Sequence, residues 1–173
     1  MYNGPEQISN GFAHFFSSVF SQAENENLQH QPPNDYFCYT PITKKEILDA
    51  LRKLKGNRAV GPNGIPGYIV KACGDLLCDP LIHIFNLSLK TSIYPKAWQI
   101  SKVIPTYKSG ARNDITNYRP ITIVNAVSKV FEIILFQRIY EKVKGHISDY
   151  QHGFLPRKST LTNLLTFSQY VCT

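Results

Sequence analysis

Four cationic side chains on one short stretch, residues 98–124, have the clearest potential for chemistry. The stretch reads WQISKVIPTYKSGARNDITNYRPITIV, with a polar, glycine-containing turn between two runs rich in Val, Ile, Thr and Tyr. Guanidinium and ammonium groups around one turn can donate several charge-assisted hydrogen bonds to phosphate oxygens. The pattern predicts a phosphate-binding element, and the alternative is an ordinary solvated hairpin. The cations are Lys102, Lys108, Arg112 and Arg119.

The elements that must position these cations are two strands. Residues Ser101 to Tyr107 and Tyr118 to Val124 are rich in β-branched and aromatic side chains, which favour strands. Residues 110–117 supply the turn residues between them. The stretch therefore predicts an antiparallel β-hairpin with a long, mobile tip.

Three groups of motifs, spread in order over residues 53–165, resemble the fingers of reverse transcriptases from non-LTR retrotransposons of the LINE and jockey type. The central group contains Trp98, a strand, Lys108-Ser109-Gly110 and Asn117-Tyr118-Arg119-Pro120-Ile121, followed by a helix with Ser128-Lys129 and Phe131-Glu132. The flanking motifs are Gly61-Pro62-Asn63-Gly64-Ile65-Pro66 upstream, and Gln151-His152-Gly153-Phe154 with Lys158-Ser159-Thr160 downstream.

The resemblance implies roles for particular residues. Lys108 and Arg119 would hold the incoming triphosphate. The family usually has Asp where this chain has Asn63. The family also usually has Gly-Arg-Ser where this chain has Arg157-Lys158-Ser159, so the template contact carries over to Lys158 rather than to Arg157. The residues expected to contact nucleic acid are Lys55, Arg58, Gly61, Asn63, Gln151, Lys158 and Ser159.

The carboxylates of nucleotidyl transfer have no counterpart in this sequence. The reaction needs two metal ions held by converging carboxylates, which the family supplies from palm segments beyond the last motif found here. No two Asp or Glu are adjacent, and no GxSxG, Walker or HExxH pattern occurs. The sequence therefore predicts no catalytic or metal-ligating residue, no DNA synthesis by the chain alone, and a role for Mg²⁺ only with an intact palm.

Charge favours a polyanionic partner. All 19 Lys and Arg lie at or after Lys44, together with eight of the 12 Asp and Glu, so residues 44–173 carry a formal charge of +11 and residues 1–43 carry −4. A basic region of this kind is typical of nucleic-acid binding. The expected partners are an RNA template or a primer–template duplex, a dNTP, and the missing palm or the rest of the element's protein, but no membrane.

Cysteine usage and the N-terminal sequence indicate the compartment. The four cysteines lack the paired spacing of metal sites, which predicts reduced thiols in an intracellular protein, nuclear or cytoplasmic. Residues 1–20 show no basic start and no continuous apolar core, so no signal peptide is expected and the protein is not predicted to be secreted.

The length of 173 residues allows one domain of ordinary size. We expect an aromatic amphipathic helix over residues 1–21, a polar linker over 22–40, and over 41–173 the fingers-like part of a reverse transcriptase domain, truncated before the catalytic palm. The predicted fold class is α+β, mostly helical with an antiparallel β-hairpin, resembling the fingers of a right-hand polymerase.

Further helix boundaries follow from capping signals. Thr43 with Glu46 predicts a capping box. A short helix is expected over 66–73, then one capped by Asp79 with Pro80 in its first turn and reaching about Thr91, and a long amphipathic one over 127–144. The last helix should begin after Ser159, with Leu161, Leu164 and Leu165 facing inward.

Two functions remain open at this point. The first is a partial RNA-directed DNA polymerase domain of a non-LTR retrotransposon, which binds template and incoming dNTP but lacks the catalytic aspartates. The alternative is a basic RNA-binding or scaffold protein derived from such an element.

Overall fold

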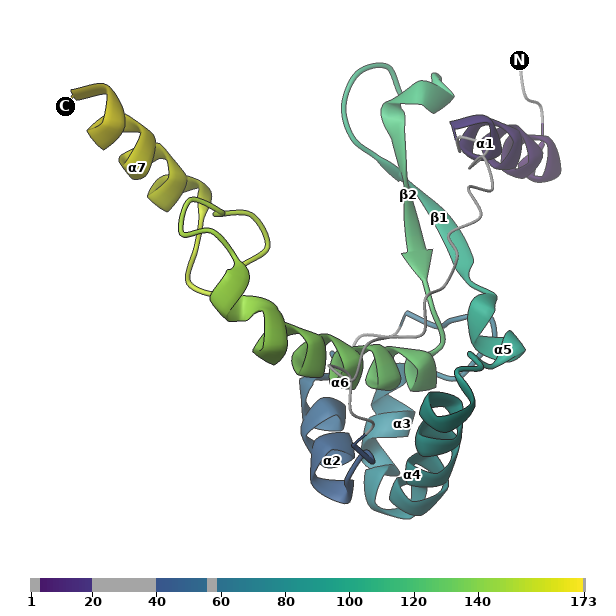
Figure 1. The fold of residues 1–173 in the computed structure, drawn as a ribbon. Helices are drawn as coiled ribbons and strands as arrows, with labels where there is room; N and C mark the ends of the chain where they lie inside the picture. Colours follow the sequence, from purple (N-terminus) through teal and green to yellow (C-terminus); the bar gives the residue numbers. More distant parts are fainter. Residues whose placement is uncertain (1–3, 20–39, 56–58, 173) are drawn as a thin grey trace, which may run out of the picture. The chain divides into compact units, whose positions relative to one another are not determined.

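A computed structural model describes residues 4–19, 40–55 and 59–172 of the chain (Figure 1). The chain divides into two compact units, Met1–Ile133 and Ile134–Thr173, and the boundary falls within one long helix. Each unit is described by itself. The predicted linker over 22–40 lies outside the described residues, apart from its last residue.

The first helical element of the basic region is α2 (Lys44–Lys53), and its capping box is confirmed. The Thr43 side chain accepts a hydrogen bond from the Glu46 amide, and the Glu46 carboxylate accepts one from the Thr43 amide at 2.9 Å. Ile47, Ala50 and Leu51 form the buried face of the helix. Apolar residues three and four apart lie on one side of a helix, so α2 packs that side against its neighbours, α3 and α4.

Helices α3 (Gly67–Ala72) and α4 (Gly74–Thr91) follow with only Cys73 between them. The predicted start of α4 at Asp79 is wrong, because the helix begins at Gly74 and Pro80 lies inside it. A proline in a helix leaves the carbonyl four residues earlier without its N–H partner. That carbonyl belongs to Leu76, a residue 83% exposed, and the helix continues through Pro80 to Thr91.

An aromatic cluster forms the centre of the first unit, where α4 meets α5 (Lys96–Gln99) and the first half of α6 (Ala126–Val143). The ring of Phe85 lies 4.9 Å from that of Phe131 and 5.7 Å from that of Trp98, between ring centroids. Tyr94 closes the cluster against Trp98 at 5.6 Å. Phe85 and Phe131 are almost completely buried, so these rings carry much of the apolar burial that holds the unit together.

The predicted hairpin is confirmed as β1 (Lys102–Tyr107) paired antiparallel with β2 (Tyr118–Ile123). Thr106 lies opposite Arg119, and Tyr107 lies opposite Tyr118. Pro105 and Pro120 also face each other, and since neither has an N–H group they occupy a pair that exchanges no backbone hydrogen bonds. The chain is thus mostly helical with a two-stranded antiparallel sheet, which agrees with the predicted α+β class.

The N-terminal aromatic helix, α1 (Pro5–Val19), contacts the tip of this hairpin. The ring of Phe12 meets that of Tyr118 edge to face at 4.9 Å and stacks on Phe16 at 5.7 Å. This helix therefore packs on the basic region, and its anchor is the first residue of β2.

Replacing Phe12 by Ala should loosen α1 from the hairpin. Edge-to-face aromatic pairs contribute about 0.5–1.5 kcal/mol beyond simple burial. Hydrogen exchange of the α1 amides should become faster in this variant, whereas Val19→Ala, at a residue 69% exposed, should leave exchange nearly unchanged. Equal effects of the two substitutions would contradict the contact.

The second unit contains the end of α6, the short 3-10 helix η2 (Lys144–His146) and α7 (Thr160–Cys172). Ser159 caps α7 as predicted, since its hydroxyl accepts a hydrogen bond from the Thr162 amide at 3.3 Å. The predicted inward orientation of three leucines is wrong, because within this small unit no second layer covers their side of α7. Leu161, Leu164 and Leu165 are 60 to 63% exposed.

No helix in the described ranges is both long enough and apolar enough to cross a membrane.

Candidate nucleotide and nucleic-acid interface

The two faces of the hairpin differ in chemistry. Successive side chains of a strand point to opposite faces, so paired positions share a face. Thr106 and Arg119 lie on one face, and because the Lys108 amide donates to the Asn117 carbonyl at 2.9 Å, the ladder continues and brings Lys108 to the same face. Diagonal neighbours on one face lie about 7–8 Å apart. Lys108 and Arg119 are therefore close enough to contact neighbouring phosphates of one ligand.

The opposite face of the hairpin is aromatic and carries one of the four cationic side chains, Arg112. Tyr107 and Tyr118 meet edge to face at 5.7 Å, and the Arg112 guanidinium lies 5.1 Å from the centre of the Tyr107 ring. The Tyr118 hydroxyl also donates to the Arg112 carbonyl at 2.9 Å. The structure thus separates the cations: Arg112 joins the aromatic face, and Lys102, Lys108 and Arg119 share the other, which we call the cationic face.

Hydrogen bonds made by its own side chains stabilise the tip of the hairpin. The Asp114 carboxylate caps a 3-10 helix, η1 (Ile115–Asn117), by accepting from the Thr116 hydroxyl at 2.7 Å and from the Thr116 amide at 2.9 Å. The Asn117 side chain donates to the Ala111 carbonyl. Gly110 has φ +93°, and a Cβ there would meet Asn117 at 2.6 Å, so only glycine fits.

These hydrogen bonds to Asp114 have a measurable consequence for titration. The Thr116 hydroxyl first, and then the Thr116 amide, lower the pKa of the Asp114 carboxyl below its ordinary value. Because folding lowers this pKa, the ionised Asp114 carboxylate stabilises the folded state at pH values above its pKa in the unfolded chain. That stabilisation is lost as the pH falls through the pKa of Asp114 in the folded chain. In Thr116→Val the pKa of Asp114 should rise, whereas Thr106→Val should leave it unchanged. An NMR titration of the carboxyl carbon would measure both, and an unchanged pKa in Thr116→Val would contradict the assignment.

The loop at Gly61 and Asn63 is held against the end of the hairpin. The Asn63 amide donates to the side-chain oxygen of Asn125 at 3.2 Å, and the Asn63 side chain accepts from the Ile65 amide. A Cβ on Gly61 would lie 2.8 Å from the Val124 carbonyl oxygen. The glycine therefore allows the loop to approach the β2–α6 connection, and Asn63, where the family usually has Asp, shapes its own turn.

In the second unit, a loop is stabilised by hydrogen bonds of its own side chains, those of Gln151, Lys158 and Ser159. The Lys158 ammonium donates to the Asp149 carbonyl at 2.9 Å, and the Gln151 side chain donates to the Gly153 carbonyl. The residues predicted to contact nucleic acid thus fall into two groups: Lys55, Gly61 and Asn63 in the first unit, and Gln151, Lys158 and Ser159 in the second. Arg58 lies outside the described residues.

Comparisons with known proteins agree with these motifs, although no family model matches the chain. A Pol polyprotein from the type-1 retrotransposable element R1 of Bradysia coprophila is 30% identical over 118 residues, which cover 66% of the chain and 12% of that relative. The RNA-directed DNA polymerase from the mobile element jockey of Drosophila funebris is 29% identical over 117 residues, 66% of the chain and 13% of the relative. A probable RNA-directed DNA polymerase from transposon BS of Drosophila melanogaster is 23% identical over 164 residues, 92% of the chain and 18% of the relative.

The chain resembles reverse transcriptases of non-LTR retrotransposons. The resemblance predicted from the motifs is therefore confirmed, at low sequence identity and over most of the chain. The matched stretches span only 12 to 18% of the length of these three polymerase relatives.

One residue that joins separate segments of this reverse-transcriptase-like chain, Asn125, was missed by sequence reasoning. Asn125 is buried and joins three segments, because its side chain also donates to the Ala97 carbonyl at 2.7 Å. An Asn directly before an apolar helical run is a signal that could have drawn attention to it. His152 is buried between Thr162 and Thr166, with its Nδ1 2.9 Å from the Thr162 hydroxyl oxygen, and is a satisfied core histidine.

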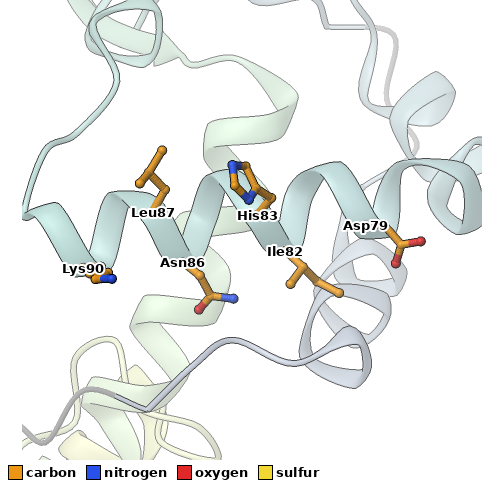
Figure 2. Close-up of a pocket in the computed structure, with 6 residues that line it drawn as sticks. All are labelled: Asp79, Ile82, His83, Asn86, Leu87 and Lys90. Atoms are coloured by element: carbon orange, nitrogen blue, oxygen red, sulfur yellow. The ribbon is translucent and has the colours of Figure 1, made fainter.

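A depression of about 460 Å³ on the described surface lies along α4 and belongs to none of these elements. Figure 2 shows that its side chains leave a single helix in different directions and do not converge. Asn86 is already engaged, since its amide group exchanges two hydrogen bonds with the backbone of Ile42. We assign this depression no ligand; it is lined by Asp79, Ile82, His83, Asn86, Leu87 and Lys90.

Proposed function

We propose that the chain is a partial reverse transcriptase domain, the fingers-like part of an RNA-directed DNA polymerase, and that it binds template and incoming dNTP without catalytic aspartates of its own. The observation that carries the proposal is the shared placement of Lys108 and Arg119 on the cationic face of the hairpin. Permanent positive charge on a preorganised hairpin suits a triphosphate, because such contacts gain strength where water is excluded.

The proposal contains no metal-dependent step within this chain. Within the ranges that the structure describes, no three His, Cys, Asp or Glu side chains gather into a possible metal site. This observation on the described residues supports the proposal that the carboxylates of the two-metal arrangement come from outside this chain. We propose that Mg²⁺ enters the reaction only with a palm, which would supply the carboxylates.

Binding of RNA or a primer–template duplex should be strongly salt-dependent. Residues 44–173 carry a formal +11, and neutralised phosphates release counterions on binding. A protein making about 6–10 phosphate contacts loses roughly 10³- to 10⁵-fold in affinity between 50 and 200 mM salt. Fluorescence anisotropy with a labelled RNA would measure this loss, and a flat dependence on salt would remove nucleic acid as the partner.

The alternative, a basic RNA-binding or scaffold protein derived from such an element, differs in its response to nucleotides. A fingers-like part should bind a dNTP through Lys108 and Arg119, whereas a scaffold needs no such contact. Titration of the chain with a labelled dNTP, compared with Lys108→Ala and Arg119→Ala, separates the two. Weaker dNTP binding in both variants supports the proposed function, and RNA binding without any response to dNTP supports the scaffold.

A further inference from the structure

The side chain of Asn125 departs from the use that its position in the chain favours. The Asn125 carbonyl accepts the Lys129 amide at 3.0 Å and α6 begins at Ala126, so Asn125 is the N-cap of that helix. An asparagine at an N-cap normally turns its side-chain oxygen to an N–H group in the first turn of its own helix. Here the residue is only 4% exposed, and its side chain is bonded to two segments that lie 28 and 62 positions away in the sequence. Departures from local preference are expected at functional or strained positions.

Both ends of the Asn125 side-chain amide have a defined partner. Its oxygen accepts the Asn63 amide at 3.2 Å, and its NH₂ group donates to the Ala97 carbonyl at 2.7 Å. Turning the amide over would set an N–H group against an N–H group and an oxygen against an oxygen. Making both bonds therefore requires one acceptor and one donor on a short stem, which is what asparagine provides.

These bonds lie at the base of the hairpin. Ala97 belongs to α5, five positions before β1 begins, and Asn125 follows the end of β2 by two positions. The bond between them therefore joins the two legs of the hairpin below the last pair of its ladder. The bond to Asn63 ties the same point to the Gly61 loop, which approaches so closely that a Cβ on Gly61 would lie 3.0 Å from the Asn125 Cα.

The base of the hairpin controls where its cationic face points. Both strands are largely exposed along their length, and a two-stranded sheet is only marginally stable by itself. Arg119 lies six positions from Asn125, which is roughly 20 Å along a strand that rises about 3.3 Å per residue. A tilt of about 5° at the base therefore moves Arg119 by about 2 Å, and Lys108 is at least as far from the base.

We propose that Asn125 is a positioning residue, which joins the two legs of the hairpin to the Gly61 loop and so fixes the direction in which Lys108 and Arg119 are held for a nucleotide. The inference rests on the proposed function and deepens it, because it names a buried residue that acts on the nucleotide through other residues. It also gives a reason for the unusual N-cap, since the side chain cannot cap α6 and join these segments at once.

Asn125→Ser tests the proposal, because serine is also a favoured N-cap and should preserve the start of α6. Its hydroxyl oxygen lies where Asn125 has Cγ, one bond short of both partners. In the full chain, the affinity for a labelled dNTP should fall by about 10- to 100-fold, since misplacing a preorganised group by about 1 Å can cost about 100-fold. Asn125→Asp keeps one oxygen for the Asn63 amide but sets the other against the Ala97 carbonyl, and it should lose a similar factor.

A second measurement reports the direction of the hairpin itself. Time-resolved energy transfer from Trp98, the single tryptophan, to an acceptor amino acid introduced at the exposed Ser109 gives the distribution of distances between the aromatic cluster and the hairpin tip. The distribution should become broader in Asn125→Ser and in Asn125→Asp, because the base of the hairpin is then free to tilt.

The matched control is Ser128→Ala, in the first turn of the same helix. Ser128 is fully buried, and its hydroxyl donates at 2.8 Å to the Asn125 carbonyl, an oxygen that the Lys129 amide also bonds. This variant loses a buried hydrogen bond, and with it some stability, without releasing either bond of the Asn125 side chain. Its dNTP affinity and its distance distribution should both stay near those of the unaltered chain.

The outcomes separate this inference from the proposed function. An unchanged distance distribution in Asn125→Ser, or equal broadening in Ser128→Ala, would overturn the role of Asn125 in fixing the hairpin and leave the proposed function standing. Broadening without any loss of dNTP affinity would overturn its role in nucleotide binding. No dNTP binding by the unaltered chain would overturn the proposed function, and the distance distribution would still decide whether Asn125 fixes the hairpin.

Discussion

Phe85→Ala should destabilise the first unit by about 3–5 kcal/mol, the largest stability loss that we expect from one substitution. The side chain is fully buried and meets the rings of Trp98 and Phe131 at 5.7 and 4.9 Å. Removing a buried Phe loses its transfer free energy and leaves a cavity that neighbours fill only in part. Urea unfolding followed by the fluorescence of Trp98, the single tryptophan of the chain, would report this unit directly.

The matched control is Phe167→Ala on α7, where the side chain is 63% exposed. Surface substitutions away from special contacts usually change stability by less than about 0.5 kcal/mol. The two variants lose the same atoms, one set from the buried core of the first unit and the other from an exposed position in the second unit. A loss in Phe85→Ala no larger than in Phe167→Ala would mean that the aromatic cluster is not the core.

Arg119→Ala should remove about 2–4 kcal/mol of nucleotide interaction when the chain is joined to an intact polymerase palm. The guanidinium lies on the cationic face beside Lys108, and charge-assisted, preorganised contacts to a triphosphate are of this size. The apparent KM for nucleotide should rise or kcat should fall. Affinity for primer–template should stay near its starting value, because the proposed contact is to the nucleotide.

Two further variants make this test specific. Arg119→Lys should recover only part of the loss, since an ammonium group cannot reproduce the planar fork of a guanidinium. Arg112→Ala removes an arginine from the same hairpin, but its guanidinium lies over the Tyr107 ring on the opposite face, so nucleotide kinetics should change little. Unchanged kinetics in both Arg119 variants, or weaker template binding instead, would make Arg119 a residue that positions the backbone.

Local sequence was sufficient where neighbouring residues decide the structure. The capping box at Thr43 and the strands on either side of residues 108–117 depend on side chains within a few positions of one another, and both were predicted correctly. The start of α4 was not, because Pro80 was read as a residue of the first helical turn, whereas the helix begins six residues earlier at Gly74 and continues through the proline. The exposure of Leu161, Leu164 and Leu165 was missed for a similar reason, since helical spacing shows that a face is apolar but not what covers it.

The sequence by itself determined the relationship of this protein to reverse transcriptases, because the order of its motifs can be read without coordinates. It also determined the basic character of the region after Lys44. Only the tertiary structure decided which cations lie on the same face. Strand register places Lys108 and Arg119 on one face and turns Arg112 to the other. Chain folding brings Lys55 and Lys129, 74 positions apart in the sequence, to the lining of one depression of about 320 Å³. Spacing along the chain cannot encode these arrangements, because they depend on how distant elements pair and pack.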